Sequence, residues 1–198
     1  MRSSKDLPLF GGLLCLDFVN SLDWRGRTEP VEYLGTYDDL LEWAIRAGAM
    51  TAAQARPLRR ACGKPAAAAA LQRAIEFREA AYRVLRAAIA REAARDADLR
   101  RINSLVAQAR GGSQLRQTRH GFSWDLPERK NPDLPLLPVA LSLGDLLTSD
   151  DLRHVRLCGG PECGWLFLDT SKNQRRRWCS MQGCGNRAKA RRHYMRAR

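Results

Sequence analysis

Four cysteines near the C-terminus form two matched pairs. Each pair has the spacing Cys-x4-Cys, and fifteen residues separate Cys158 and Cys163 from Cys179 and Cys184. Thiolates spaced in this way can meet at one ion, and Zn2+ suits a closed shell of four sulfurs. Two disulfides, an iron–sulfur cluster or inert thiols are the alternatives. A closed shell leaves no position for a reacting water, so the pattern indicates a structural metal site.

The segment that carries these cysteines is strongly basic. From Asp151 to Arg198 it holds 12 Lys/Arg and 3 Asp/Glu, a net of +9 out of the +13 of the whole chain, and no acidic residue follows Asp169. Like charges this dense favour a polyanionic partner over a merely solvated tail, although charge does not separate DNA from RNA. The predicted nucleic-acid-binding residues are Lys172, Arg175, Arg176, Arg177, Arg187, Lys189, Arg191 and Arg192.

The remaining composition indicates a globular protein of the cytoplasm. With 198 residues, 44% hydrophobic and 28% charged, the chain suffices for one ordinary domain and a small module. The apolar stretch 7–19 is interrupted by Pro8, a Gly-Gly pair and Asp17, so we expect no signal peptide and no membrane span. Paired cysteines in a reducing compartment more often hold metal than form disulfides. Cys15 and Cys62 are expected to be small buried hydrophobic residues.

No motif of a catalytic site is present, so we expect that the protein is not an enzyme. The sequence lacks a P-loop, a Gly-rich dinucleotide turn, an HExxH motif and a plausible triad. The rival interpretation is an enzymatic or small-molecule-binding N-terminal body, with the basic tail as a docking device. Five residues could line a pocket for a small effector, although helix caps and loop contacts explain them equally well: Asp17, Asn20, Asp23, Trp24 and Arg25.

Patterns in the first 148 residues predict a mainly helical domain. The apolar run 13–19 is too short for its periodicity to distinguish a strand from a helix, and 24–30 is predicted to be a loop. Capping boxes at Thr36 and Thr51, an Ala-rich run and apolar stripes predict the helices. Their expected ranges are 36–48, 51–63, 66–93, 96–109 and 134–147.

A small β-hairpin is predicted between the last two of these helices. Phe122, Trp124 and Leu126 alternate with polar residues, which predicts a hairpin over 114–126 that turns at His120 and Gly121. The overall expectation is therefore a mainly α fold of the α+β type.

The segment 149–198 is expected to form a ββα module similar to a zinc ribbon, joined to the body by a hinge at 148–151. We predict Cys158 and Cys163 on a first turn, a strand over 164–168, a polar turn over 169–174, a return strand over 175–178, and a helix from Asn186 to about Arg196. A segment of this size with few large apolar side chains has too little core to fold alone, so metal binding should contribute much of its folding free energy.

The C-terminal segment resembles the CGNR-type zinc finger, which is named for the stretch Cys184-Gly185-Asn186-Arg187. The resemblance also covers Cys179-Ser-Met-Gln-Gly before it, Ala-Lys189-Ala-Arg191 after it, and Cys163-Gly-Trp165-Leu-Phe167-Leu-Asp169-Thr-Ser171 upstream. In such proteins the finger usually follows an ABATE domain, which is associated with stress-induced transcription regulation. Leu16-Asp17-Phe18-Val19-Asn20-Ser21 is similar to the opening of that domain.

The resemblance implies a bacterial, cytoplasmic regulator of transcription that binds DNA and is associated with the nucleoid when bound. It implies one structural Zn2+ per chain, held by Cys158, Cys163, Cys179 and Cys184. The helical domain would sense an effector or form a homodimer. Within the motif, Asn186 is expected to cap the following helix through its side-chain oxygen. Arg187 could pair with Asp169, contact the thiolates, or contact phosphate.

Overall fold

The computed structural model describes residues 4–119, 121–125 and 131–196. Its α-helices are α1 (Leu14–Val19), α2 (Tyr37–Arg46), α3 (Ala52–Ala61), α4 (Lys64–Ala90), α5 (Asp96–Gly112), α6 (Leu137–Leu147) and α7 (Asn186–Arg196). Its strands are β1 (Leu22–Asp23), β2 (Val31–Glu32), β3 (Gln114–Thr118), β4 (Gly121–Asp125), β5 (Val155–Leu157) and β6 (Leu166–Leu168), which pair in order as three antiparallel two-stranded sheets. This confirms the predicted mainly α fold.

The helices begin where the sequence supplies their caps. Thr36 accepts a hydrogen bond from the Asp39 amide while the Asp39 side chain accepts from the Thr36 amide, and Thr51 and Gln54 repeat the arrangement. These reciprocal bonds satisfy backbone groups that have no partner inside the helix. The predicted starts of α2 and α3 are therefore confirmed.

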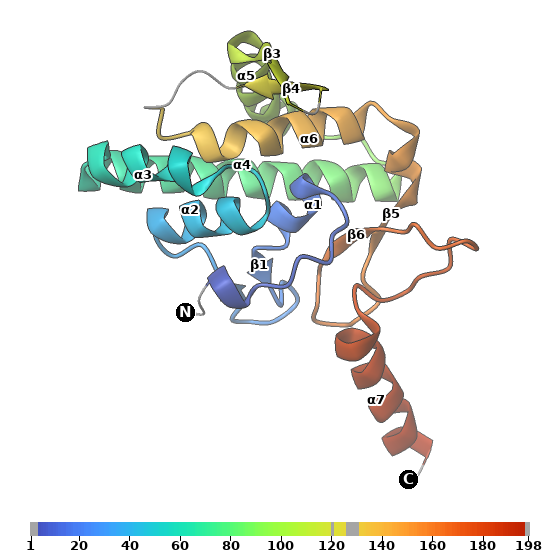
Figure 1. Ribbon diagram of the computed structural model, residues 1–198. Coiled ribbons are helices and arrows are strands. Elements are labelled where there is room, and N and C mark those ends of the chain that lie inside the picture. Colours follow the sequence, from blue (N-terminus) through green and yellow to red (C-terminus); the bar gives the residue numbers. More distant parts are fainter. Residues whose placement is uncertain (1–3, 120, 126–130, 197–198) are drawn as a thin grey trace.

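The long helix α4 is the centre of the molecule (Figure 1). In that view α6 lies above it, and α2 and α1 lie below it. Phe18 of α1 packs between two aromatic neighbours, with ring centroids 5.1 Å from Trp43 of α2 and 6.0 Å from Phe77 of α4. All three side chains are almost fully buried. This aromatic cluster fixes the three helices to one another.

The apolar run 13–19, for which the sequence did not distinguish a strand from a helix, forms the helix α1. Cys15, Leu16, Phe18 and Val19 are buried, whereas Asp17 is only partly buried. Buried positions at this spacing suit a helix that is covered on most of its sides. The loop predicted for 24–30 lies between β1 and β2, a two-residue pair that the sequence pattern did not indicate.

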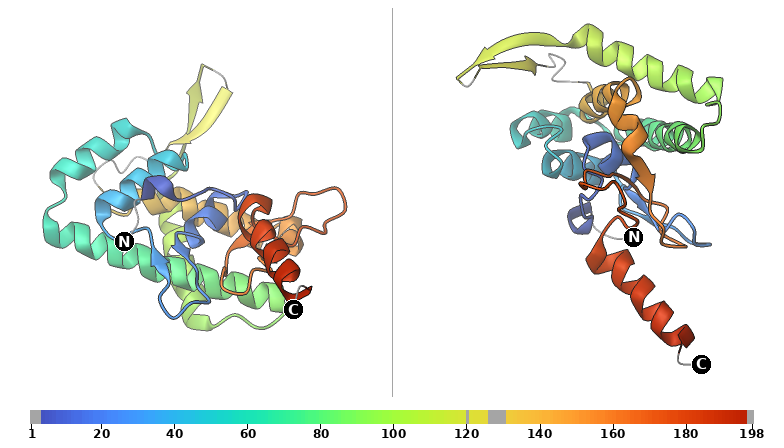
Figure 2. Two further views of the ribbon diagram at one scale, coloured as in Figure 1. Left: turned by 90° about the horizontal axis from the view of Figure 1, so that it is seen from below. Right: turned by 90° about the vertical axis from the view of Figure 1, so that its right-hand side faces the viewer.

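The predicted hairpin is present as β3 and β4. Its register pairs Leu115 with Trp124 and Gln117 with Phe122. Residues 120 and 126, which the prediction included, lie outside the described residues. Figure 2 shows the hairpin projecting beyond the helices in both views.

The C-terminal module has two strands and a helix, but its strand pairing differs from the prediction. The strand expected at 164–168 is β6, and it pairs with β5, which precedes the first cysteine pair. Residues 175–178 form no strand. Their backbone groups have other partners, because Arg177 O accepts from the Gly159 amide and the Arg176 amide donates to Asp169. The predicted return strand is therefore wrong.

The body and the C-terminal module share one hydrophobic core. Val155, Leu166 and Phe167 belong to the same buried cluster as the residues of α1, α2 and α4. A 3-10 helix, Asp150–His154, follows α6 and leads directly into β5, where the sequence suggested a hinge. In the described part of the chain, no helix combines the length and the apolar character needed to cross a bilayer.

Candidate metal centre and its basic surroundings

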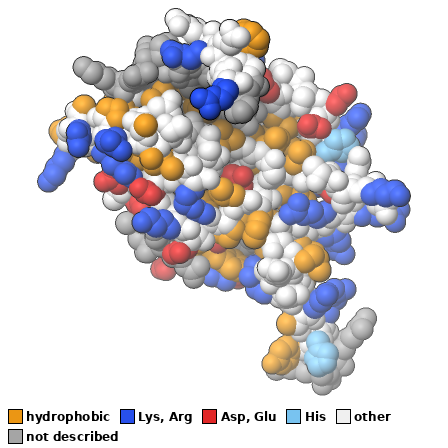
Figure 3. All heavy atoms as spheres, in the orientation of Figure 1, with side chains coloured by type: hydrophobic (Ala, Val, Ile, Leu, Met, Phe, Trp, Pro, Cys, Tyr) orange, Lys and Arg blue, Asp and Glu red, His pale blue; other side chains and the backbone are white. Residues whose placement is uncertain are grey.

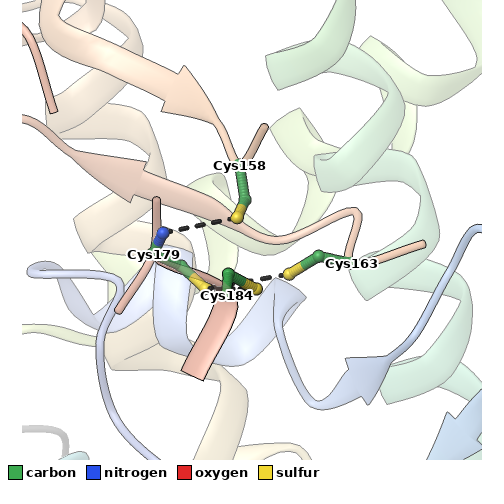
Figure 4. A group of neighbouring side chains, drawn as sticks. All are labelled: Cys158, Cys163, Cys179 and Cys184. Carbon is green, nitrogen blue, oxygen red and sulfur yellow. Dashed lines mark hydrogen bonds between the residues drawn. The ribbon is translucent and has the colours of Figure 1, made fainter. Parts of the chain in front are cut away.

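The four cysteine side chains of the two pairs point toward a common centre (Figure 4). Their sulfurs all lie within 4.8 Å of one another, and all four side chains are buried. Cys179 Sγ lies 3.7 Å from Cys163 Sγ and 3.6 Å from Cys184 Sγ. Four ligands about 2.3 Å from a tetrahedral ion are about 3.8 Å apart, so the spacing fits a closed tetrathiolate shell. The cysteines are not bonded to one another as disulfides.

The four sulfurs hold protons unequally: the pKa values of Cys158 and Cys184 are lowered, whereas hydrogen bonding to Cys158 raises those of Cys163 and Cys179. Hydrogen bonding to Cys163, and then to Cys179 and Cys184, lowers the pKa of the Cys158 thiol. The Cys179 amide also donates to Cys158 Sγ at 3.3 Å, and the Arg187 guanidinium donates to Cys184 Sγ at 3.0 Å. Thiolate is the form of cysteine that ligates a metal. The surroundings of these residues therefore suit a dication.

Two short turns place the sulfurs. Cys158 and Cys163 flank the turn between β5 and β6, and the Cys158 amide donates to Trp165 O across it at 2.8 Å. Cys184 lies in a short π-helical turn, Met181–Gly185, which runs directly into α7. The metal site thus lies at the base of α7 and sets where that helix begins.

The first cysteine turn is held by the body of the protein. In the loop after β1, the Arg25 amide donates to Cys163 O at 3.2 Å and the Gly26 amide donates to Glu162 O at 3.1 Å. Tyr82 of α4 donates its hydroxyl to Gly164 O at 3.0 Å. A Cβ at Gly164 would lie 2.6 Å from Arg25 Cβ, so only glycine allows this approach.

Beneath that loop lies a network of paired charges. Arg25 forms a bidentate pair with Glu79, at 2.7 and 3.0 Å. Glu79 also accepts from Arg78, whose other nitrogens bond Glu32 and Ser21. Arg78 is 1% exposed, and although burial opposes its charge, the hydrogen bonds that it donates to Glu32 and Glu79 keep its pKa raised. The network joins α4, β2 and the loop that holds the metal site.

Trp24, in the loop after β1, contacts a residue at the start of α7. The Arg27 and Arg187 guanidinium carbons lie 3.5 and 4.6 Å from the centroid of its ring. Its φ of +57° is in the left-handed region, which is unfavourable for a residue with a large side chain. Of the alternatives raised from the sequence, the structure shows the contact of Arg187 with a cysteine sulfur, and a phosphate contact by its exposed side chain stays a prediction.

The five residues suggested as an effector pocket have structural contacts. Asn20 bonds the backbone of Leu166, and Asp17 accepts from the Gly11 amide at 2.7 Å. Asp23 accepts from the Trp24 amide, while Trp24 and Arg25 contact the segment that holds the metal site. Most of these contacts join the body to the C-terminal module. A ligand pocket formed by the five together stays a prediction.

The predicted nucleic-acid-binding residues fall into two groups. Arg176 is partly buried, its guanidinium donates to the carbonyl oxygens of Trp178 and Cys179, and it lies 4.4 Å from the Phe167 ring centroid. Arg187 is engaged with Cys184 and Trp24. The others are largely exposed, namely Lys172, Arg175, Arg177, Lys189, Arg191 and Arg192. Figure 3 shows Lys and Arg side chains on the projecting loop and along α7.

Three of these exposed basic side chains, from the loop and from α7, meet at one hollow of about 470 Å3. Arg177 of the loop and Arg191 and Arg192 of α7 line it, together with Trp178 and Met195. Among the described residues that line this hollow, none is acidic. A cationic surface of this kind attracts phosphate groups.

Sequence reasoning missed the structural role of Asp169 and predicted the wrong role for Asn186. Asp169 accepts hydrogen bonds from the amides of Ser171 and Arg176 and from the Ser171 hydroxyl. Its burial by itself would raise its pKa, but these hydrogen bonds lower the pKa below its usual value. The Asp-x-Ser spacing, typical of a side-chain turn, could have revealed it. Asn186 donates to Gln182 O at 3.3 Å, so the side-chain oxygen cap expected of it is not what the structure shows.

Comparison with known proteins identifies two families along the chain. Residues 12–150 match the ABATE family, described as "Putative stress-induced transcription regulator", and residues 154–197 match the CGNR zinc finger. Neither description names an enzymatic activity. No curated protein matches the chain. The second match contains all four clustered cysteines and α7.

Proposed function

Because the chain belongs to the ABATE family and ends in a CGNR zinc finger, we propose that it is a Zn2+-dependent DNA-binding regulator of transcription. Zn2+ would be held by the four clustered cysteines, one ion per chain. The DNA would be contacted by the basic loop that ends at Arg177 and by α7. Such a regulator acts in the bacterial cytoplasm, on the nucleoid when it is bound.

The observation that carries the proposal is the cationic hollow between the loop and α7. Arginines that are 14 or more positions apart in sequence converge there because the metal site joins the loop to the base of the helix. Arginine donates bidentate hydrogen bonds to phosphate and to guanine, which suits backbone and base contacts alike.

The shape of α7 favours double-stranded DNA over RNA. The helix projects away from the body in Figure 1 and in the right-hand view of Figure 2. Its 11 residues include no acidic residue. An α-helix can enter the major groove of B-form DNA, whereas the major groove of an A-form RNA duplex is too narrow for it.

The role of the metal in this proposal is structural. Four sulfurs leave no open position on the ion, so a bound Zn2+ would fix the geometry of the loop and of α7 and would not take part in a reaction. Arg187 supports this role, since its guanidinium both neutralises a thiolate and contacts Trp24 of the body.

A binding assay at several salt concentrations tests the proposal. Fluorescence anisotropy with a labelled DNA duplex would compare the native chain with the variant Arg177→Ala, Arg191→Ala, Arg192→Ala. The variant should bind more weakly, and the slope of log K against log salt should fall by about one unit for each lost phosphate contact. Arg176 is left in place because its contacts hold the loop together.

The matched control replaces two exposed arginines of α3, Arg56→Ala with Arg60→Ala, on the body. It removes two positive charges, against three in the test variant, and should leave the slope unchanged. Equal losses in the two variants would refute a localised interface. Preferential binding to an RNA duplex of the same sequence would replace DNA with RNA as the partner.

A further inference from the structure

The hairpin of β3 and β4 exposes an apolar face. Leu115 is 60% exposed and Phe122 is 69% exposed. In the observed register Gln117 lies opposite Phe122, and Leu115 is two residues from Gln117, so Leu115 and Phe122 share one face of the hairpin. A two-stranded hairpin is marginally stable in water unless its apolar face packs on another surface. We therefore expect the apolar face of this hairpin to pack against another surface.

A groove of about 720 Å3 lies beside the base of the hairpin. It is bounded by the end of α5, by α6 and by the start of α1, and Leu13, Leu141 and Leu146 give it an apolar lining. Ser113, the residue that joins α5 to β3, also lines it. Among the described residues, Leu115 and Phe122 of the same chain do not line the groove and are exposed.

We propose that the hairpin of one copy packs into this groove of a second copy, and that the exchange is reciprocal in a two-fold symmetric homodimer. Leu115 and Phe122 are the side chains that enter the groove. The inference concerns a surface remote from the metal site and does not rest on DNA binding.

Charge complementarity favours a second copy as the occupant. The hairpin carries Arg119 at its turn. The mouth of the groove carries Asp145 and Asp151, and the Asp145 side chain is 73% exposed. Opposite charges around an apolar contact fix its register and disfavour other partners. In the single chain, Asp145 has a long, solvent-exposed pair with Arg110, at 3.3 Å.

The position of the hairpin favours a closed dimer over an open chain of subunits. Because Ser113 belongs both to the base of the hairpin and to the groove, the donating and accepting surfaces are continuous. A two-fold axis through such a surface lets each hairpin reach the other groove at one interface. If the two surfaces lay on opposite sides of the molecule, the same contact would extend into fibres.

Analytical ultracentrifugation of the full metal-loaded chain tests the proposal. The native chain should sediment as a dimer, and Leu115→Ser with Phe122→Ser should raise the dimer dissociation constant roughly tenfold or more. Both replaced side chains are exposed, so the fold should persist, which circular dichroism checks. The control variant Tyr194→Ser with Met195→Ser removes exposed apolar side chains of α7 and should leave the dimer intact.

Charge reversal supplies a second, positive test. Arg119→Glu should weaken the dimer, and adding Asp151→Arg should restore it. A native chain that sediments as a monomer overturns the proposal. The same holds if a small ligand fills the groove and the chain is monomeric for that reason. A dimer that persists in the Leu115→Ser, Phe122→Ser variant overturns it as well.

Discussion

Asn20 forms two hydrogen bonds with the backbone of Leu166. Its Nδ2 donates to the Leu166 carbonyl oxygen at 2.8 Å, and its Oδ1 accepts from the Leu166 amide at 2.9 Å. Asn20 is 1% exposed and follows α1, whereas Leu166 begins β6 of the zinc-finger segment. One amide side chain thus serves as the strand partner of β6 on the side away from β5. The body completes the sheet of the finger.

We expect Asn20→Ala to loosen the finger from the body. The substitution leaves the Leu166 amide and carbonyl without their partner, and each unsatisfied buried group costs about 1–3 kcal/mol. Urea denaturation should show an unfolding free energy lower by roughly 2–4 kcal/mol, and limited proteolysis should cut the finger faster. The control is Asn103→Ala, at an exposed site on α5. Equal stability of the two variants would contradict the structural role of Asn20.

Local sequence signals predicted the elements that depend on nearby residues. The capping boxes at Thr36 and Thr51 and the paired cysteines each act within a few positions, so their patterns can be read directly. The pairing of β5 with β6 could not be predicted in this way, because strands of three residues show too little alternation. The Asn20 contact could not be read either, since 146 positions separate it from Leu166.

The metal-ligating cysteines could be predicted from the sequence, but the residues of the body that hold them in place could not. Cysteine spacing alone indicated the four sulfurs that the structure brings together. Nothing local indicates that Arg25, Gly26 and Tyr82 hold the first cysteine turn, because their partners are backbone atoms far along the chain. Arg25 was among the residues suggested as an effector pocket. Polar side chains beside an apolar segment can serve either a ligand or another part of the fold.

The buried Arg78 gives a second prediction about stability. Replacing it with Ala leaves Glu32 without its charged partner and leaves Glu79 with Arg25 alone, and breaking a buried pair typically costs about 3–5 kcal/mol. Chemical denaturation of Arg78→Ala should therefore show a large loss. Arg101→Ala, which removes an exposed ion pair with Glu76, should cost no more than about 1 kcal/mol. Similar losses in the two variants would argue against the network as a buried unit.

Removal of the metal should destabilise the helical body and not only the finger. The turn that presents Cys163 is bonded to Arg25, Gly26 and Tyr82, and the finger shares the hydrophobic core of the body. Because metal binding contributes folding free energy to such sites, a chelator should lower the melting temperature measured from the helical circular dichroism signal. Added Zn2+ should restore it.

Cysteine variants separate this effect from a general effect of the chelator. Cys179→Ser should melt at the lower temperature with or without chelator, whereas Cys62→Ser, outside the cluster, should respond as the native chain does. A helical melting curve that chelation does not move would show that the body folds independently of the metal site.

The raised pKa of Asp17 predicts that its contribution to the unfolding free energy falls as pH rises, whereas that of a salt-bridged carboxylate increases. Burial raises its pKa from 3.8 to about 6, against the hydrogen bond from the Gly11 amide, which lowers it. Between these two values the folded chain binds the proton more strongly than the unfolded chain does. The contribution of Asp17 to the unfolding free energy is thus fully present below about pH 4 and is lost as pH rises through about 6.

The variant Asp17→Asn isolates this contribution. Its amide oxygen can still accept from the Gly11 amide, but it never ionises. At neutral pH the variant should be more stable than the native chain by at most ~3 kcal/mol, since each pKa unit corresponds to about 1.4 kcal/mol. The difference should shrink as pH falls below 6 in paired urea titrations. The exposed Asp96→Asn should show no such trend, and a constant difference for Asp17→Asn across this range would rule out the raised pKa.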